Sequence, residues 1–319
     1  MGEFDLIERF FKRPPRKADV GIGDDCAVWS PRAGHQLAFS ADMLVEGRHF
    51  LSTVEPSRLG HKALAVNLSD LAACGATPQA FLLSLSLPRA DESWLSGFSH
   101  GLFQLADAHH CELIGGDTTQ GPLNIAITVM GEVPVGQSIL RSGAQAGDDL
   151  YVSGHLGDAR LALEAFRGSV SLPQSVFDAA RIRMERPTPR VALGMALRGV
   201  AHAMADISDG LLGDLGHILK ASRVGAEIDL AAMPALMQTT QLWTCPPDLA
   251  LTCVLSGGDD YELVFCAPPS ASETVHAVSK ASGTPVTKIG RITDQPQLVL
   301  LDAQGQAVPS KFRSFDHFA

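Results

Sequence analysis

The sequence alternates between two kinds of apolar pattern, and this alternation is what most restricts its fold. From residue 56 to residue 78, apolar side chains such as Leu59 and Val66 recur at helical spacing. From residue 81 to residue 88, polar and apolar side chains alternate, which is typical of a half-buried strand. Further segments of both kinds follow, joined by short connections rich in glycine and proline. The sequence therefore predicts a mixed α+β fold.

The length and the distribution of turn-forming residues predict two domains. A chain of 319 residues suffices for two domains of ordinary size, each with its own core. Proline, glycine and serine concentrate between residues 133 and 149, where regular periodicity stops, and a strand-like run resumes just beyond. We therefore expect one domain at residues 1–138 and a second at residues 139–319.

The overall charge and the cysteine pattern restrict the partners and the compartment. The formal net charge is −10, so a basic nucleic-acid-binding surface is not expected. No run approaches the ~20 apolar residues of a membrane helix, and the charged start of the chain lacks a signal-peptide pattern. The six cysteines form no C-x-x-C pair, and Cys26, like most of them, is expected to be a buried apolar thiol. These features predict a cytoplasmic protein without nucleic-acid or membrane partners.

Aspartates recur where apolar segments meet turns. They are Asp24, Asp25, Asp42, Asp117, Asp206, Asp209, Asp259 and Asp260. Asp70 differs, because it lies within an apolar helical segment. Any single aspartate can cap a helix or close a turn. Clustered carboxylates, however, repel one another unless a divalent cation lies between them, and their oxygen atoms suit Mg²⁺. The spacing alone leaves a structural role and a shared metal site both open.

Three glycine-containing turns place aspartates where phosphate chemistry is plausible. GIGDDCAVW reads as a turn that leads into a strand. In LIGGDTT, paired glycines at a strand exit let backbone amides approach a phosphate, and Asp117 can hold a cation. In ADISDGLL, we expect Ser208 as the helix N-cap, with Asp206 and Asp209 at the helix start, where an anion or its bound metal is favoured. A tight turn or an ordinary helix start explains these patterns equally well.

Several standard motifs are absent from the sequence. There is no P-loop pattern, no G-x-S-x-G elbow and no EF-hand loop, and the dinucleotide-binding pattern fails at Cys26. Arg141 is equally consistent with a phosphate ligand and with a solvated loop residue, and His49 alone is more typical of a surface turn. The residues therefore indicate metals that bridge carboxylates to a polyphosphate, without giving the substrate.

Taken together, seven stretches resemble the thiamine-monophosphate kinase family. They are GIGDDCAV, FSADMLVEGRHF, KALAVNLSDLAACGATP, LIGGDTT, RSGAQAGD, DISDGLLGDLGHI and LSGGDDYEL. This family belongs to a larger group that includes aminoimidazole ribonucleotide synthetase, selenophosphate synthetase and the hydrogenase maturation factor HypE. The match runs in order from about residue 3 to the FDHF end of the chain. KALAVNLSDLAACGA and IGGDTT are specific to the group, whereas VEGRHF and FDHF favour the thiamine-phosphate member.

The resemblance implies transfer of a phosphoryl group from ATP to thiamine monophosphate, giving ADP and thiamine diphosphate. It also implies a homodimer in which N-terminal strands pair into a barrel. Residues 1–138 would bind ATP and Mg²⁺ and form the dimer, and residues 139–319 would complete the ATP and substrate sites.

The resemblance also implies roles for individual residues by motif position. Several Mg²⁺ ions would be held by Asp25, Ser40, the backbone of Ala41, Asp42, Asp70, Asp117, Asp206 and Asp209. ATP would contact Gly116, Asp117, Arg141 and Ser208, and thiamine phosphate would contact His49, Asp259 and Phe312. A requirement for a monovalent cation stays open.

Three positions depart from the family pattern. Ala41 replaces a threonine, so only its carbonyl oxygen could serve a metal. Asp259 replaces a glutamate, which shortens its reach toward the cationic thiamine rings. Phe312 replaces a tryptophan, which keeps a stacking surface but weakens the cation–π interaction. These changes concern the affinity for thiamine more than the reaction.

The proposed acceptor suggests a mechanism. A phosphate oxygen is already anionic near neutral pH, because the second phosphate pKa is ~6. The lack of an obvious catalytic histidine or lysine therefore fits direct in-line transfer, without a phosphoenzyme, in which metals and Arg141 stabilise charge.

Two other functions remain as alternatives. One is another ATP-using enzyme of the same group, of the ring-closing synthetase type. The other is a non-catalytic nucleotide or metal sensor, which the retained aspartates disfavour. A selenophosphate synthetase is disfavoured, because it needs a reactive cysteine and Cys26 is expected to be buried.

Overall fold

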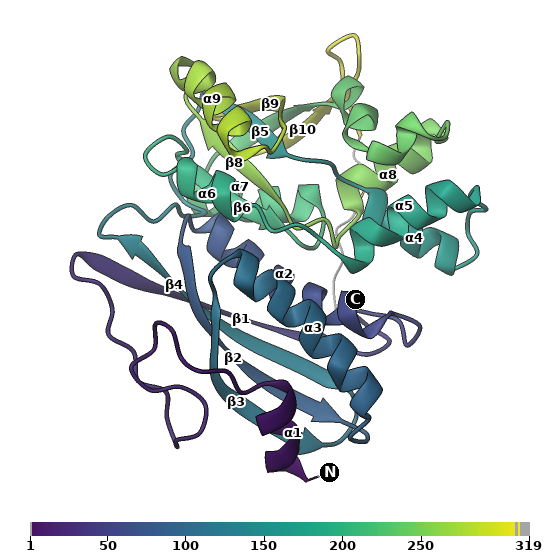
Figure 1. Ribbon diagram of the computed structural model, residues 1–319. Helices are drawn as coiled ribbons and strands as arrows, with labels where there is room; N and C mark the ends of the chain where they lie inside the picture. Colours follow the sequence, from purple (N-terminus) through teal and green to yellow (C-terminus); the bar gives the residue numbers. More distant parts are fainter. Residues whose placement is uncertain (1, 310–311, 313–319) are drawn as a thin grey trace. The chain divides into compact units, whose positions relative to one another are not determined.

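The chain divides into two compact units, which are drawn in the computed structural model of Figure 1. The structure describes residues 2–309 and Phe312. Unit 1 comprises Met1–Leu71 and Ala76–Gly136, and unit 2 comprises Ala72–Gly75 and Gln137–Ala319. Within the described residues, no helix combines the length and apolarity needed to cross a membrane.

Unit 1 is built on a mixed sheet with the order β1-β4-β2-β3, four strands among the residues described. The strands are β1 (His35–Val45), β2 (Thr77–Leu87), β3 (Glu112–Gln120) and β4 (Asn124–Pro134). β4 pairs antiparallel with β1 and β2, whereas β2 and β3 run parallel. Side chains of β2 alternate between buried and exposed from Phe81 to Leu85, as the sequence pattern predicts.

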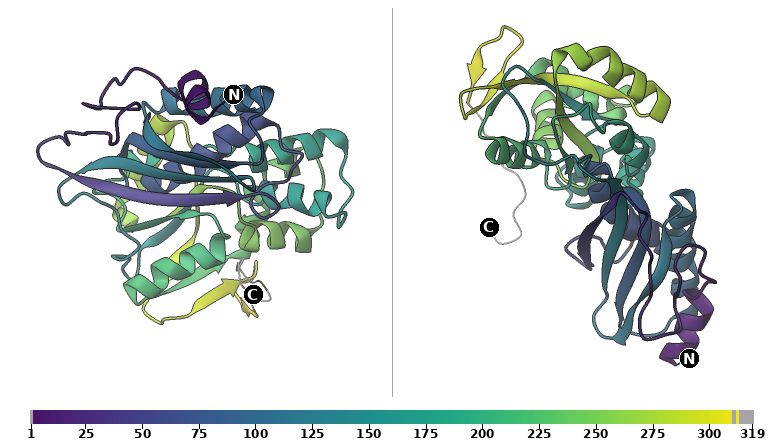
Figure 2. Two further views of the ribbon diagram at one scale, coloured as in Figure 1. Left: turned by 90° about the horizontal axis from the view of Figure 1, so that it is seen from below. Right: turned by 90° about the vertical axis from the view of Figure 1, so that its left-hand side faces the viewer.

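Two long helices cover one face of this sheet. They are α2 (Pro56–Ala73) and α3 (Glu92–Ala108), and the shorter α1 (Glu3–Phe10) precedes them in the chain (Figures 1 and 2). Their apolar sides are buried at positions such as Leu64, Leu68 and Phe98. Burying an apolar side chain of this size contributes about 1.5–3 kcal/mol. Asp91 starts α3, because its carboxylate accepts a hydrogen bond from the amide of Trp94 at 3.1 Å.

The opposite face of the sheet is only partly covered. Phe39 and Met43 of β1 and Leu82 of β2 expose 63%, 54% and 39% of their surfaces. Further along β4, Met130 is buried beneath the N-terminal loop that carries Trp29. One part of this face therefore exposes large apolar side chains to solvent, whereas another part is covered and forms a small core around Met130.

Unit 2 contains a sheet with the order β11-β10-β7-β9-β5-β8-β6, seven strands in the described part of the chain. The strands are β5 (Asp149–Ser153), β6 (Ala203–Ile207), β7 (Gly225–Asp229), β8 (Glu262–Ala267), β9 (Val286–Thr293), β10 (Leu298–Leu301) and β11 (Ala307–Val308). β10 and β7 are parallel, and the other neighbours are antiparallel. Strands β5 and β8 are buried along their whole length, and so is β6, although it lies at the edge of the sheet.

Helices of two kinds complete unit 2. The α-helices are α4 (Asp158–Phe166), α5 (Gln174–Glu185), α6 (Val191–Ala196), α7 (Leu211–Ser222), α8 (Pro247–Ser256) and α9 (Ser272–Ser282). The 3-10 segments are η1 (Leu230–Leu236), η2 (Gln238–Gln241) and η3 (Pro269–Ala271). Leu215 of α7 and Val254 of α8 join Ile207 of β6 in one buried apolar core.

One local prediction was wrong and another is confirmed. The GIGDDCAVW segment does not lead into a strand, because only isolated bridges join Val20 to Val28 and Ile22 to Asp24. The helix predicted within residues 56–78 is confirmed as α2, which begins at Pro56 and ends at Ala73. Gly75 follows in a left-handed conformation with φ +68°, and β2 begins at Thr77.

Candidate functional site

A cavity of about 1090 Å³ within unit 1 gathers three of the predicted site residues. Asp25, Gly116 and Asp117 line it together. Apolar side chains such as Ile22 share the rest of its wall with charged side chains such as Lys12. A concave site lined by both apolar and charged groups suits a small ligand that has both a charged and an aromatic part.

The backbone of β3 requires glycine next to Asp117. Gly116 has φ +145°, and a Cβ atom there would lie 1.8 Å from the carbonyl oxygen of Leu83. The pairing of β2 with β3 also shifts register between Phe81 and Leu82. Glycine is therefore needed for the strand to pass this point, whether or not its amide also meets a phosphate.

The adjacent Asp24 and Asp25 have different environments. The Asp24 carboxylate accepts a hydrogen bond from the amide of Asp25 at 2.8 Å, which closes the turn that follows Gly23. The side chains of Asp25 and Cys26 are exposed and line the cavity. The prediction that Cys26 is buried was therefore wrong, because this segment is an irregular loop rather than a core strand.

A second group of predicted site residues lies between β1 and α2. The hydroxyl of Ser40 donates a short hydrogen bond to the carboxylate of Asp70. Two residues further along β1, the amide of Asp42 donates to the side-chain oxygen of Asn67 at 3.0 Å. Asn67 is buried one helical turn before Asp70, and sequence reasoning missed it although it belongs to the same NLSD motif. Ala41, between the two, is exposed.

His49 is held close to the end of β1. Its Nδ1 atom accepts a hydrogen bond from the amide of Val45 at 3.0 Å, and its carbonyl oxygen accepts one from the ammonium group of Lys62 at 3.2 Å. Lys62 is only 2% exposed. Sequence reasoning missed this buried lysine of α2, whose position in HKALAVNLSD was the available signal.

In unit 2, two loops that carry predicted site residues are joined by backbone hydrogen bonds. The amide of Asp259 donates to the carbonyl oxygen of Ser208 at 2.9 Å, and the amide of Tyr261 donates to that of Ile207 at 2.8 Å. Asp259 and Tyr261 have positive φ angles of 68° and 51°, which non-glycine residues rarely adopt. The tyrosine hydroxyl also contacts the Asp259 carboxylate at 3.2 Å.

The start of α7 differs from the prediction. Ser208 is not the N-cap, because the helix begins at Leu211 with Gly210 in the capping position. One carboxylate oxygen of Asp214 instead accepts hydrogen bonds from the amides of Ser208, Asp209 and Gly210 at 3.0, 3.0 and 3.1 Å. Burial raises the pKa of Asp214 to about 6. The preference of serine for the N-cap was outweighed by this longer-range carboxylate.

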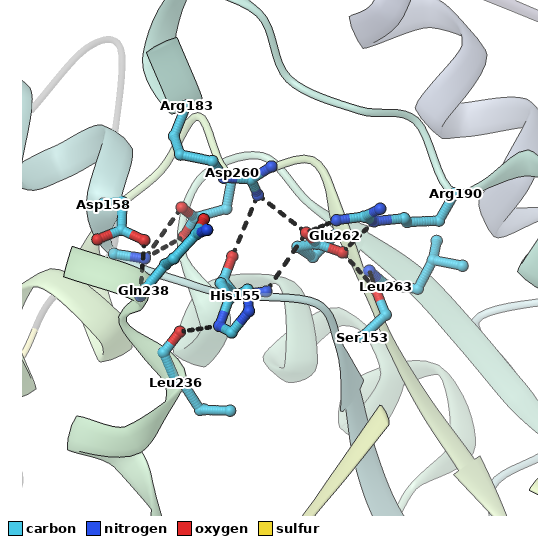
Figure 3. A network of polar contacts seen from close by, with 11 residues as sticks. Ser153, His155, Asp158, Arg183, Arg190, Leu236, Gln238, Asp260, Glu262 and Leu263 are labelled. Carbon is cyan, nitrogen blue, oxygen red and sulfur yellow. Dashed lines mark hydrogen bonds and ion pairs between the residues drawn. The ribbon is translucent and has the colours of Figure 1, made fainter. Parts of the chain in front are cut away.

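A buried polar network includes Asp260 and Glu262, which follow Asp259 in the chain (Figure 3). Glu262 has no exposed surface and accepts hydrogen bonds from Arg190 at 2.5 and 2.6 Å, from Arg183 at 2.9 Å, and from the hydroxyl of Ser153 at 2.6 Å. The carboxylate of Asp260 accepts a hydrogen bond from the amide of Gly157 at 2.9 Å. Burial raises the pKa of Asp260 well above its usual value.

The remaining predicted residues of unit 2 lie in varied settings. Asp206, at the end of β6, is 5% exposed, and Asp209 is half-buried. Arg141 is exposed in a loop. The hydroxyl of Ser222 anchors this loop by donating a hydrogen bond to the carbonyl oxygen of Arg141 at 3.2 Å. Phe312 packs partly buried against the core of unit 2. The FDHF end lies outside the described residues.

The predicted metal ligands divide between the two units. Asp25, Ser40, Ala41, Asp42, Asp70 and Asp117 belong to unit 1, whereas Asp206 and Asp209 belong to unit 2. Across residues 2–309 and Phe312, no group of three or more His, Cys, Asp or Glu side chains is arranged to hold a metal ion. The structure thus brings together Ser40 with Asp70, and Asp25 with Asp117 around one cavity.

Sequence comparison decides the family. Profiles of the AIR synthase related protein match residues 23–133 with its N-terminal domain and residues 145–302 with its C-terminal domain. The thiamine-monophosphate kinase of Escherichia coli K12 is 43% identical over 326 aligned positions, which cover 100% of this chain and 98% of the relative. The chain belongs to the thiamine-monophosphate kinase family.

Solved structures of thiamine-monophosphate kinases share the fold. The crystal structure of the enzyme from Stenotrophomonas maltophilia K279a has a TM-score of 0.85 and 43% identity, covering 96% of each chain. The structure of AaThiL complexed with AMPPCP and TMP has a TM-score of 0.76 and 30% identity, covering 91% of this chain and 89% of that one. These matches confirm the family resemblance and the mixed α+β fold predicted from the sequence.

Proposed function

We propose that this protein transfers the γ-phosphoryl group of ATP to thiamine monophosphate, giving ADP and thiamine diphosphate. The observation that carries the proposal is 43% identity to thiamine-monophosphate kinase over the whole chain. The AaThiL structure adds support, because that relative is complexed with AMPPCP, an ATP analogue, and with TMP. A cytoplasmic location follows as part of the proposal, since all six cysteines are free thiols.

For ATP we assign Gly116 and Asp117 in unit 1, and Arg141 and Ser208 in unit 2. The cavity that Gly116 and Asp117 line has enough volume and apolar wall for a nucleotide base. Arg141 is exposed, so its guanidinium can reach a phosphate. For thiamine phosphate we assign His49, Asp259 and Phe312.

The donor set fits Mg²⁺. The assigned residues Asp25, Ser40, Asp42, Asp70, Asp117, Asp206 and Asp209 offer only oxygen atoms, with a carbonyl oxygen at Ala41. Hard oxygen donors suit Mg²⁺, which usually takes one or two carboxylates together with water and phosphate oxygens, so a complete cage of protein ligands is not required. When bound, Mg²⁺ supplies positive charge that offsets the repulsion between the two phosphate-bearing substrates. Any monovalent-cation requirement is tested by varying K⁺ and Na⁺ in the assay.

The residues have little covalent chemistry to perform in this reaction. A phosphate oxygen of thiamine monophosphate attacks the γ-phosphorus, and the bond to the ADP oxygen breaks. The nucleophile is already deprotonated near neutral pH, so no side chain need remove a proton. The main obstacle is repulsion, since two unit charges 4 Å apart interact by about 4 kcal/mol at an effective dielectric constant of ~20. The protein therefore contributes binding, alignment and positive charge.

We also propose that the protein is a homodimer. Its support is the exposed apolar surface of Phe39, Met43 and Leu82 on the sheet face of unit 1 that lies opposite α2 and α3. A second copy of the same face would remove these side chains from water. Sedimentation of a variant that combines Phe39→Glu and Met43→Glu should show monomers, whereas the unmodified chain sediments as a dimer. A monomeric unmodified chain would contradict this assignment.

ADP formation with and without thiamine monophosphate tests the proposed function, with chromatographic identification of the thiamine product. Stimulation by thiamine monophosphate and formation of thiamine diphosphate are expected.

Asp70→Asn keeps an acceptor for Ser40 but removes the charge, so activity should collapse while the fold survives. Asp178→Asn is the matched control, because Asp178 is an exposed residue of α5 whose carboxylate accepts a hydrogen bond from the side chain of Gln174 at 2.9 Å. ADP release that ignores thiamine monophosphate would favour another enzyme of the group.

A further inference from the structure

The turn before α7 is organised by a carboxylate that lies after it in the chain. One oxygen of Asp214 accepts the amides of Ser208, Asp209 and Gly210 at 3.0–3.1 Å. Asp214 is 4% exposed. The amides of three successive residues thus converge on a single buried anion, a concave arrangement of donors that elsewhere binds phosphate.

The occupied amides change what this turn can offer to a ligand. Free amides at a helix start favour a phosphate, but these three already have an anionic partner. The carbonyl oxygen of Ser208 is also engaged, because it accepts the amide of Asp259 at 2.9 Å. The half-buried side chains of Ser208 and Asp209 are therefore the groups that the turn can present outward. A hydroxyl and a carboxylate are suited to a cation and to its bound phosphate rather than to a bare anion.

The position of Asp214 in the helix explains this reach. It is the fourth residue of α7, and helical side chains lean toward the N-terminus of their helix. Gly210 provides the left-handed bend, with φ +114°, that curls the preceding amides around the carboxylate. An ordinary cap pairs with one or two amides, so a third bond goes beyond what capping α7 requires.

We propose that Asp214 is a positioning residue for the metal- and ATP-binding turn: its carboxylate fixes the backbone of Ser208–Gly210 so that the Ser208 and Asp209 side chains face the nucleotide. The proposal rests on the proposed function, and it adds a residue outside the assigned ligand set. Asp214 acts through the backbone and touches neither substrate nor metal.

The test compares Asp214→Asn and Asp214→Ala with Asp91→Ala. Asp91 also caps a helix through its carboxylate, at α3, so its loss reports the effect of capping alone. Binding of Mg²⁺-AMPPCP is measured by calorimetry, and the unfolding temperature of each variant is measured in parallel. Asn retains one acceptor oxygen without the charge, and it provides a folded variant should the alanine variant fail to fold.

We expect Asp214→Asn to bind Mg²⁺-AMPPCP about tenfold more weakly, because charge-assisted hydrogen bonds to the turn are lost. The KM for MgATP should rise by a similar factor, whereas Asp91→Ala should lower only the unfolding temperature. Asp214→Asn with unchanged nucleotide affinity and a lowered unfolding temperature would overturn the proposal and leave Asp214 as a helix cap. Because nucleotide binding is measured directly, this result is distinguishable from a failure of the unmodified protein to make thiamine diphosphate.

Discussion

The amide nitrogen of Asp259 lies 2.9 Å from the carbonyl oxygen of Ser208 and donates a hydrogen bond to it. A residue assigned to the thiamine phosphate is thereby tied to a residue assigned to ATP. The amide of Tyr261 also donates a hydrogen bond to the carbonyl oxygen of Ile207. This bond lies next to the last pair of β6 and β8, Ile207 with Glu262, and so extends their antiparallel pairing toward Asp259. A shift of either loop must therefore move the other.

Substitution of Gly258 should lower the catalytic efficiency for ATP and for thiamine monophosphate together. A Cβ atom at Gly258 would lie 2.4 Å from the carbonyl oxygen of Ser208, so alanine must push the two loops apart. We expect Gly258→Ala to lower kcat/KM for ATP and for thiamine monophosphate by about tenfold or more, corresponding to overpacking of roughly 1–3 kcal/mol. Gly216→Ala, in α7 with nothing near its Cβ position, is the control and should leave both values unchanged. A change confined to one substrate would show that the loops move independently.

Cys26 should report nucleotide binding through its reactivity. It is exposed and lines the same cavity as Asp25 and Asp117. Burial raises the pKa of Cys111 and of Cys253 to about 12, so these thiols should react only after unfolding. Iodoacetamide followed by peptide mass spectrometry should find Cys26 modified in the folded protein, and MgATP should slow that modification severalfold. Equal rates with and without MgATP would place the nucleotide outside this cavity.

Loss of the Glu262 charge should be costly to stability. Arg183 and Arg190 both pair with this fully buried carboxylate, so Glu262→Gln leaves buried positive charge uncompensated. We expect the free energy of unfolding to fall by about 3–5 kcal/mol. Glu227→Gln removes a more exposed ion pair with Arg291 and should cost less than about 1 kcal/mol. Urea denaturation of both variants measures the difference, and similar losses would contradict a special role for the buried network.

Asp260 should make stability depend on pH. Burial raises the pKa of Asp260 in the folded protein above its unfolded value of about 3.9. At a pH between these two pKa values, the native state holds a proton on Asp260 that the unfolded state has released. The free energy of unfolding should therefore fall as the pH rises through this window, by up to about 1.4 kcal/mol per pH unit. Asp260→Asn removes this contribution. The difference in stability between the unmodified chain and the variant, measured from pH 4 to pH 7, should change steadily, and parallel curves would show that Asp260 titrates normally.

Local sequence patterns were sufficient to predict most elements. The half-buried strand predicted over residues 81–88 forms most of the second half of β2 (Thr77–Leu87), because the alternation of polar and apolar side chains is a property of neighbouring residues. The placement of Asp70 within a helix follows for the same reason. The resemblance to a family could be recognised because its motifs are contiguous.

Contacts between distant residues could not be predicted in this way. Glu262 meets Arg183 and Ser153 across 79 and 109 positions of the chain, and no periodic pattern encodes such pairing. The role of Asp214 was not predicted, because Ser208 fits the N-cap pattern, whereas the carboxylate of Asp214 reaches the turn from one turn inside the helix. Cys26 was expected in a core strand, and only the irregular path of its loop shows that it is exposed.

Rapid-quench analysis of a single turnover with γ-labelled ATP tests direct phosphoryl transfer to thiamine monophosphate. With the enzyme in excess over ATP, and with Mg²⁺ and thiamine monophosphate present, we expect label to pass from ATP to thiamine diphosphate in one step. The same conditions with Asp70→Asn should leave the label in ATP. Label retained on the protein, or released as inorganic phosphate without labelled thiamine diphosphate, would contradict direct phosphoryl transfer.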